Sequence, residues 1–149
     1  MMRGRKGPAW TVVINAPQER VYEYVADLSR HPEWSPDDMQ ITGPTGPTHE
    51  GAMYEAVGTL RGKRNESNVF VTELEPPNRI EFEAQDSSGI AGHVFTFTPE
   101  NGGTRVTRTL YGVKQPGLAP LLYVIFRGSI NKNFNAALQK LKQRLEAGV

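Results

Sequence analysis

Few side chains in this sequence combine reactive chemistry with an apolar setting, and His93 is the first of them. It alternates with Phe95 and Phe97, and in a β-strand such alternation places all three side chains on one face. A histidine among phenylalanines can hydrogen-bond a ligand hydroxyl or carbonyl, or move a proton. The alternative is a core histidine that bonds a neighbouring protein group. Burial near Phe82, Phe95 and Phe97 predicts a neutral imidazole at neutral pH.

A second candidate is Arg108, which lies between Val106 and Leu110 in another alternating segment. If that face points inward, Arg108 is a buried cation that needs a partner. Glu73, on the face of Val69 and Val71, is the candidate, and such a pair would anchor a polar ligand head. Alternatively, a β-bulge shifts the register and leaves both side chains in solvent.

The remaining polar and aromatic candidates are weaker. Trp34 is expected to close one end of the interior, and Tyr54 and Tyr123 to bring hydroxyls near it, either toward a ligand or toward protein partners. His31 lies in a helix-start segment and His49 in a loop rich in proline and glycine. We therefore expect neither to bind a ligand, and we expect no metal site. The sequence also has no glycine-rich phosphate loop and no nucleophile elbow.

The composition excludes several classes of function. The chain has 149 residues, no cysteine and a net charge of +1, which excludes thiolate chemistry and gives no electrostatic footprint for nucleic acid. No apolar run approaches the roughly 20 residues of a membrane span, and the basic start lacks the apolar region of a signal peptide. We expect one domain over residues 1–149, with residues 1–8 flexible, in a cytoplasmic protein without a cofactor.

The segments that must position these residues begin with a short strand and two short helices. Trp10–Ile14 is a β-branched run. Asn15 and Gln18 then have the spacing of a capping box, which predicts the start of a first helix. A second, shorter helix is expected to end near Trp34, because Pro32 prevents the first from continuing.

The rest of the chain predicts a β-meander followed by one long helix. Residues 39–41 suggest an edge strand, and residues 52–113 alternate between apolar and polar side chains with short turns between segments. Such short links require antiparallel pairing. From Pro120 to Glu146, an apolar stripe of Leu122, Phe126, Ile130, Phe134, Leu138, Leu141 and Leu145 predicts a helix that covers the sheet. Small residues on the strands (Ala56, Gly58, Ala84 and Gly92) would leave space between the two layers.

Three motifs carry a family resemblance. Asn15–Asp27 with His31–Pro36, the turn Glu75–Arg79 and the hairpin Gly102–Thr107 resemble the polyketide cyclase/dehydrase branch of the START-like (SRPBCC) superfamily. The resemblance implies an α+β helix-grip fold, in which a curved antiparallel sheet of about seven strands wraps around a long C-terminal helix. It also implies an apolar cavity between the sheet and this helix.

We therefore predict that the protein binds or transports a small hydrophobic ligand, such as a lipid, an aromatic compound or a polyketide-like molecule. The expected partner is this molecule alone, without nucleic acid or stable membrane insertion, and the chain is expected to be a monomer or weak homodimer. The residues expected to line the cavity are Trp34, Tyr54, Ala56, Val71, Phe82, His93, Phe95, Phe97, Arg108, Leu110, Phe126, Ile130 and Phe134.

Two alternatives remain open. The first is a polyketide aromatase/cyclase or dehydrase in which His93, or a tyrosine, shuttles a proton. The second is a non-catalytic interaction or regulatory domain that uses the outer face of the sheet. The acidic residues Glu55, Glu81 and Glu83, expected on that outer face, argue against a large apolar patch there.

Overall fold

The computed structural model describes residues 7–36, 38–60, 62–114 and 117–149. The strands are β1 (Ala9–Ile14), β2 (Met39–Thr42), β3 (Met53–Leu60), β4 (Lys63–Glu75), β5 (Arg79–Asp86), β6 (Gly89–Glu100) and β7 (Gly103–Lys114). The helices are α1 (Gln18–Ala26), the short 3-10 helix η1 (Leu28–Glu33) and α2 (Ala119–Glu146). Most of the predicted flexible terminus, residues 1–6, lies outside the described residues, whereas Pro8 accepts a hydrogen bond from Leu110 at 3.0 Å.

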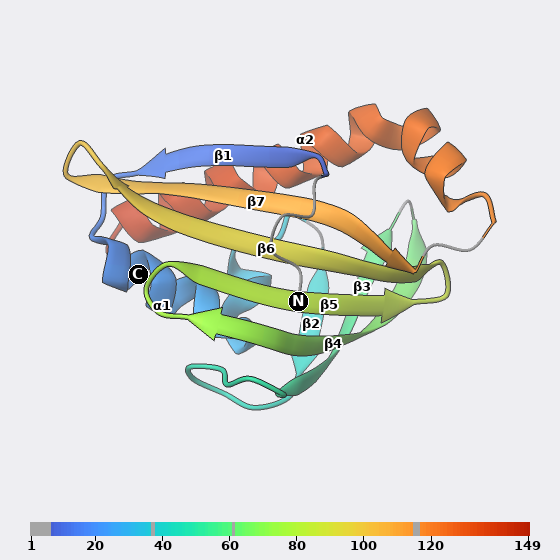
Figure 1. The fold of residues 1–149 in the computed structure, drawn as a ribbon, viewed down its shortest axis with the longest axis horizontal. Helices are drawn as coiled ribbons and strands as arrows, with labels where there is room; N and C mark the ends of the chain where they lie inside the picture. Colours follow the sequence, from blue (N-terminus) through green and yellow to red (C-terminus); the bar gives the residue numbers. More distant parts are fainter. Residues whose placement is uncertain (1–6, 37, 61, 115–116) are drawn as a thin grey trace.

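Seven strands form one antiparallel sheet in the order β1-β7-β6-β5-β4-β3-β2. Figure 1 shows this curved sheet with α1 at one end and α2 running behind β1. The predicted α+β helix-grip architecture is confirmed. The short turns of the meander explain the antiparallel strand order, because each hairpin brings the next strand back alongside the previous one.

The register places one side of every strand against the helices. His93 lies opposite Leu110 and Phe82, while Phe95 lies opposite Arg108 and Ile80. Because facing residues in antiparallel strands share a side of the sheet, these side chains form one inner layer. The inward position predicted for His93 is confirmed by this register.

The two ends of the inner face differ in how tightly α2 covers them. In the second half of α2, Leu138, Leu141 and Leu145 are at most 1% exposed. In the first half Leu122 is 46% exposed. The stripe expected to cover the whole sheet therefore seals only part of it. The neighbouring residues of the first half are also exposed: Leu118, Leu121, Val124 and Ile125.

Several local predictions are wrong. Pro17, rather than Asn15, is the N-cap of α1, and no side chain caps this helix. The Gln18 amide instead donates to Phe97 O at 2.9 Å and Asn78 Oδ1 at 3.0 Å, which ties α1 to the sheet. Gly92 leaves no interior space, since a Cβ there would lie 2.4 Å from the ring of Tyr111.

The outer face is also less solvated than its acidic residues suggest. Glu81 is 1% exposed and forms an ion pair with Arg79. Nearby, Val94 and Tyr111 are buried in a small second cluster with Val113 packed against it. Glu81 pairs in register with Val94 of this outer cluster, and this face buries an ion pair beside a few apolar side chains.

Candidate functional site

The inner face holds a hydrogen-bonded pair of basic side chains. Arg108 on β7 and His93 on β6 are both buried, and the Arg108 Nη2 lies 3.1 Å from His93 Nδ1. Arginine has only donors, so Nδ1 must be the acceptor in this bond. In a neutral imidazole the proton is then on Nε2, which can donate to a ligand oxygen.

Aromatic rings surround this pair on both sides. Phe82 stacks on the His93 ring with centroids 4.9 Å apart. The guanidinium carbon of Arg108 lies 4.5 Å from the ring centre of Phe134 and 5.0 Å from that of Phe95. Such contacts between a cation and aromatic faces are attractive, and they hold the guanidinium in place within an otherwise apolar layer.

The Arg108–Glu73 ion pair considered from the sequence is absent. A β-bulge between Val71 and Glu73 shifts the register of β4, and Glu73 pairs with Arg79 at 3.5 Å. Because of this bulge, Glu73 no longer shares a face with Val71. Arg108 nevertheless points inward, so the alternative in which both side chains are solvated is also wrong.

His31 joins the pair, although it was expected to take no part in a site. It stacks on Trp34 with ring centroids 4.1 Å apart. Arg108 helps to lower the pKa of His31, and His31 in turn helps to lower the pKa of His93. In a 3-10 helix, side chains three residues apart eclipse each other, so the His31–Trp34 spacing was the available signal. We call His31, His93 and Arg108 the basic cluster.

Burial, and for the two histidines the nearby positive charges, lower the pKa values of all three residues of the basic cluster. Desolvation, followed by the charges of Arg108 and His31, lowers the pKa of His93 well below its ordinary value. Desolvation and then Arg108 lower the pKa of His31 to about 3. Desolvation lowers the pKa of Arg108 to about 9. Both imidazoles are therefore neutral at pH 7, and Arg108 is the cation of the cluster.

Partly exposed apolar residues from both layers border the basic cluster. Ala84 and Leu110 belong to the sheet, Ile130 and Phe134 belong to α2, and all four pack against the main core while remaining partly exposed. We call these four residues the open end of the inner face. The strands β5 and β7 end, and α2 begins, at the right of Figure 1.

The residues predicted to line a cavity divide into two groups. Trp34, Tyr54, Ala56, Val71, Phe82, Phe95 and Phe97 are buried in the main core. Leu110, Phe126, Ile130 and Phe134 are only partly buried. The Tyr54 hydroxyl bonds Thr48 Oγ1 at 2.7 Å, so it is satisfied by the protein. The partly exposed group, with His93 and Arg108 beside it, is therefore the part of the predicted set that lies nearest to solvent.

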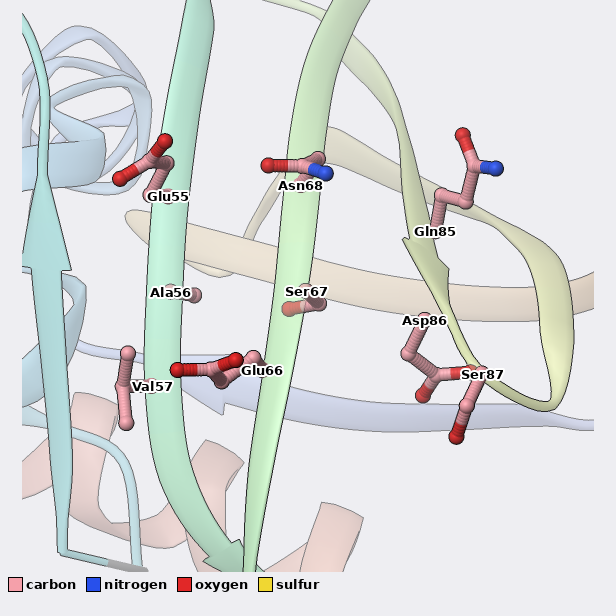
Figure 2. A pocket seen from close by; sticks show the side chains of 9 residues that line it. All are labelled: Glu55, Ala56, Val57, Glu66, Ser67, Asn68, Gln85, Asp86 and Ser87. Carbon is pink, nitrogen blue, oxygen red and sulfur yellow. The ribbon is translucent and has the colours of Figure 1, made fainter.

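A pocket of about 420 Å³ is lined by residues of β3, β4 and β5 and of the turn that follows β5. It lies where β4 extends beyond its last pairing with β5, Asn68 with Gln85 (Figure 2). Ala56 is the predicted cavity residue that lines it. A smaller pocket of about 150 Å³ shares Ala56 and Ser67 with it. The lining of the larger pocket is mostly polar: Glu55, Ala56, Val57, Glu66, Ser67, Asn68, Gln85, Asp86 and Ser87.

Two general features of the described residues bear on the site. They contain no cluster of three or more His, Asp or Glu side chains arranged to hold a metal ion. Within the same part of the chain, no helix has the length and apolar character needed to cross a bilayer.

Solved structures with this fold come from several bacteria. TTHA0849 from Thermus thermophilus has a TM-score of 0.76 at 23% identity, covering 95% of this chain and 98% of its own. CV1439 from Chromobacterium violaceum has a TM-score of 0.73 at 20% identity, covering 93% and 96%. DynU16, a protein assigned to the dynemicin biosynthetic locus, has a TM-score of 0.62 at 20% identity, covering 94% of this chain and 47% of its own. At these identities the likeness concerns the fold.

The comparison with curated proteins finds no match. A family model does match, and it spans residues 10–146. Its description is polyketide cyclase/dehydrase and lipid transport. This span includes every strand from Trp10 onward, all the helices and the whole basic cluster. The chain therefore belongs to the polyketide cyclase/dehydrase and lipid transport family.

Proposed function

We propose that the protein binds a small, mainly apolar molecule at the open end of the inner face, with His93 and Arg108 at the base of the site. The observation that carries this proposal is a buried, hydrogen-bonded polar pair bordered by partly exposed apolar side chains from both layers. Sites for small molecules have this composition, in which apolar walls supply contact area and a few polar groups fix orientation.

The energetics of such binding would come mainly from the apolar walls. Removing apolar surface from water contributes about 25 cal/mol per Å², before the cost of ordering the ligand and side chains. The proton on His93 Nε2 would then select molecules with a carbonyl or hydroxyl at the matching position. Membership of a family described by both cyclisation and lipid transport fits a ligand of this kind.

Native mass spectrometry of the protein purified from its own host tests this function. We expect a non-covalent small molecule to co-purify and to be released on denaturation. Leu110→Gln, at the open end, should abolish its retention. Val13→Gln is the control, because Val13 is an exposed apolar residue of β1 whose neighbours in sequence, Val12 and Ile14, are buried. Equal retention by both variants would contradict the proposed location.

A second candidate function is catalysis of a cyclisation or dehydration. The observation that favours it is the tautomer of His93, whose Nδ1 accepts from Arg108 and whose Nε2 is left to donate. A neutral imidazole in this state can protonate a developing alkoxide or polarise a carbonyl. The family description, which names polyketide cyclisation and dehydration, supports testing poly-β-keto substrates. Turnover that is lost in His93→Phe, while the substrate still binds, would favour the enzyme.

A further inference from the structure

Arg108 is a buried cation for which the described part of the chain supplies no acidic partner. Its side chain is on the inner face and the residue is 6% exposed. One terminal nitrogen bonds His93, and Nε is buried without a hydrogen-bond partner. Within the described residues, no carboxylate lies at ion-pair distance from the guanidinium. A buried charge in this condition is costly unless something else compensates it.

Arg79, on the same sheet, is an arginine whose charge is neutralised by nearby carboxylates. It has Glu73 at 3.5 Å, Glu75 at 3.7 Å and a direct ion pair with Glu81. Three carboxylates thus surround an arginine that is itself 14% exposed at the side chain. The inner face offers Arg108 only aromatic rings and an imidazole, which are weaker partners than a carboxylate.

The other members of the basic cluster supply no negative charge to Arg108, because both imidazoles are neutral at pH 7. His93 bonds Arg108 from β6, and His31 belongs to η1, so the three side chains of the cluster come from three elements. Phe134 contacts the guanidinium and is also part of the open end. Phe134 therefore links the guanidinium of Arg108 to the open end.

We infer that the molecule bound at the open end is an organic anion, with an apolar body and a carboxylate, sulfonate or enolate oxygen that pairs with Arg108. This inference rests on the function proposed above and specifies the chemical class of its ligand. The unpartnered Nε of Arg108 and a terminal nitrogen of the same guanidinium would donate together to the anion. This is the bidentate geometry with which arginine binds planar oxyanions. The ligand would supply the negative charge that the described residues do not place beside Arg108.

Two fluorescent probes with the same aromatic body test the inference. Anilinonaphthalene sulfonate carries an anionic group, and phenylnaphthylamine has the same rings without it. In wild-type protein we expect the sulfonate to bind more tightly by about 10- to 100-fold, as one charge-assisted interaction implies. Arg108→Met should remove this preference, while Arg108→Lys should keep part of it.

Arg105→Met is the matched control. Arg105 is exposed on the same strand and bonds Glu100, so its loss changes the net charge equally without touching the inner face. The control should keep the wild-type preference. Near-ultraviolet circular dichroism should show native packing in each variant, because the sulfonate probe also binds partly unfolded protein.

The outcomes separate this inference from the proposed function. Equal affinity for both probes in the wild type, or an anion preference that survives Arg108→Met, would overturn the inference and leave the apolar site intact. Failure of both probes to bind the folded protein would overturn the proposed function and the inference with it. A preference lost equally in Arg105→Met would show that surface charge, rather than Arg108, is responsible, and would also overturn the inference.

Discussion

The Arg108 guanidinium donates to His93 Nδ1 across the boundary between β7 and β6, at 3.1 Å. The two residues are diagonal neighbours, because Phe95 lies directly opposite Arg108 and Leu110 directly opposite His93. A long side chain and a short one thus meet on one face of the sheet. This bond fixes the tautomer of the histidine, and among the described residues the arginine has no carboxylate at ion-pair distance.

Replacing His93 by phenylalanine separates binding from catalysis. The ring still fits against Phe82, so the fold should persist. If the protein only binds, affinity for the natural ligand should fall by about 0.5–1.5 kcal/mol, the value of one hydrogen bond. If it is an enzyme, turnover should fall by about 10²- to 10⁴-fold with a smaller change in binding. Calorimetry and turnover assays on the same preparation distinguish the two results, and an unchanged affinity and turnover would remove His93 from the site.

Removing both members of the polar pair should stabilise the empty protein. His93→Phe combined with Arg108→Met replaces a buried unpaired charge by apolar groups and leaves neither partner unsatisfied. We expect the free energy of unfolding to rise by about 1–3 kcal/mol, which raises the melting temperature by about 2–4 °C per kcal/mol. Calorimetric melting of ligand-free protein measures this, and a lower melting temperature would show that the pair is structural.

The stability of the protein should depend on pH through the two histidines. His31 and His93 have folded-state pKa values below the ordinary value of 6.5. The unfolded chain therefore binds more protons below pH 6.5, and stability is fully present above that pH and falls as the pH decreases toward the folded pKa values. Each histidine contributes a slope that approaches about 1.4 kcal/mol per pH unit.

Urea unfolding between pH 6.5 and 5 isolates this effect, because most carboxylates titrate at lower pH. His31→Gln and His93→Phe should each reduce the slope relative to wild type. His49→Gln is the control, since His49 is exposed in a loop and lies outside the basic cluster. Identical slopes in all four proteins would contradict the placement of His31 and His93 in the desolvated cluster.

The two halves of α2 should differ in their contribution to stability. Leu141 is fully buried, so Leu141→Ala should cost about 2–5 kcal/mol. Phe134→Ala removes more atoms but from a partly exposed position, and we expect a smaller loss of about 1–3 kcal/mol. Chemical denaturation of both variants gives the comparison. A larger loss for Phe134→Ala would mean that the open end is as firmly packed as the rest of the core.

The strand faces of β6 and β7 were predictable because alternation with a period of two is a strong signal. His93, Phe95 and Phe97 lie inward as expected, and so does Arg108 between Val106 and Leu110. Glu73 was not predictable, because one bulge in β4 reverses the face of every residue after it. His31 was missed because the six-residue η1 is too short to show a periodic pattern.

The sequence of α2 also explains the wrong prediction for its first half. Residues 121–126 are apolar in every position, so they define no single face that must turn toward the sheet. In the second half, lysines and an arginine alternate with leucines, and only the leucines can be buried. The amphipathic second half of α2 therefore packs one defined face against the sheet. The uniformly apolar first half has no such face and leaves several side chains exposed.

Mapping of bound probe by nuclear magnetic resonance tests the central claim most directly. Amide shifts of isotopically labelled protein would be followed during titration with anilinonaphthalene sulfonate. Saturable changes should centre on Ala84, His93, Leu110, Ile130 and Phe134, whereas Val21 and Leu145 at the sealed end should not move. Saturable changes confined to the polar pocket around Glu55 and Asp86, or to the outer face around Val94, would contradict a ligand site at the open end.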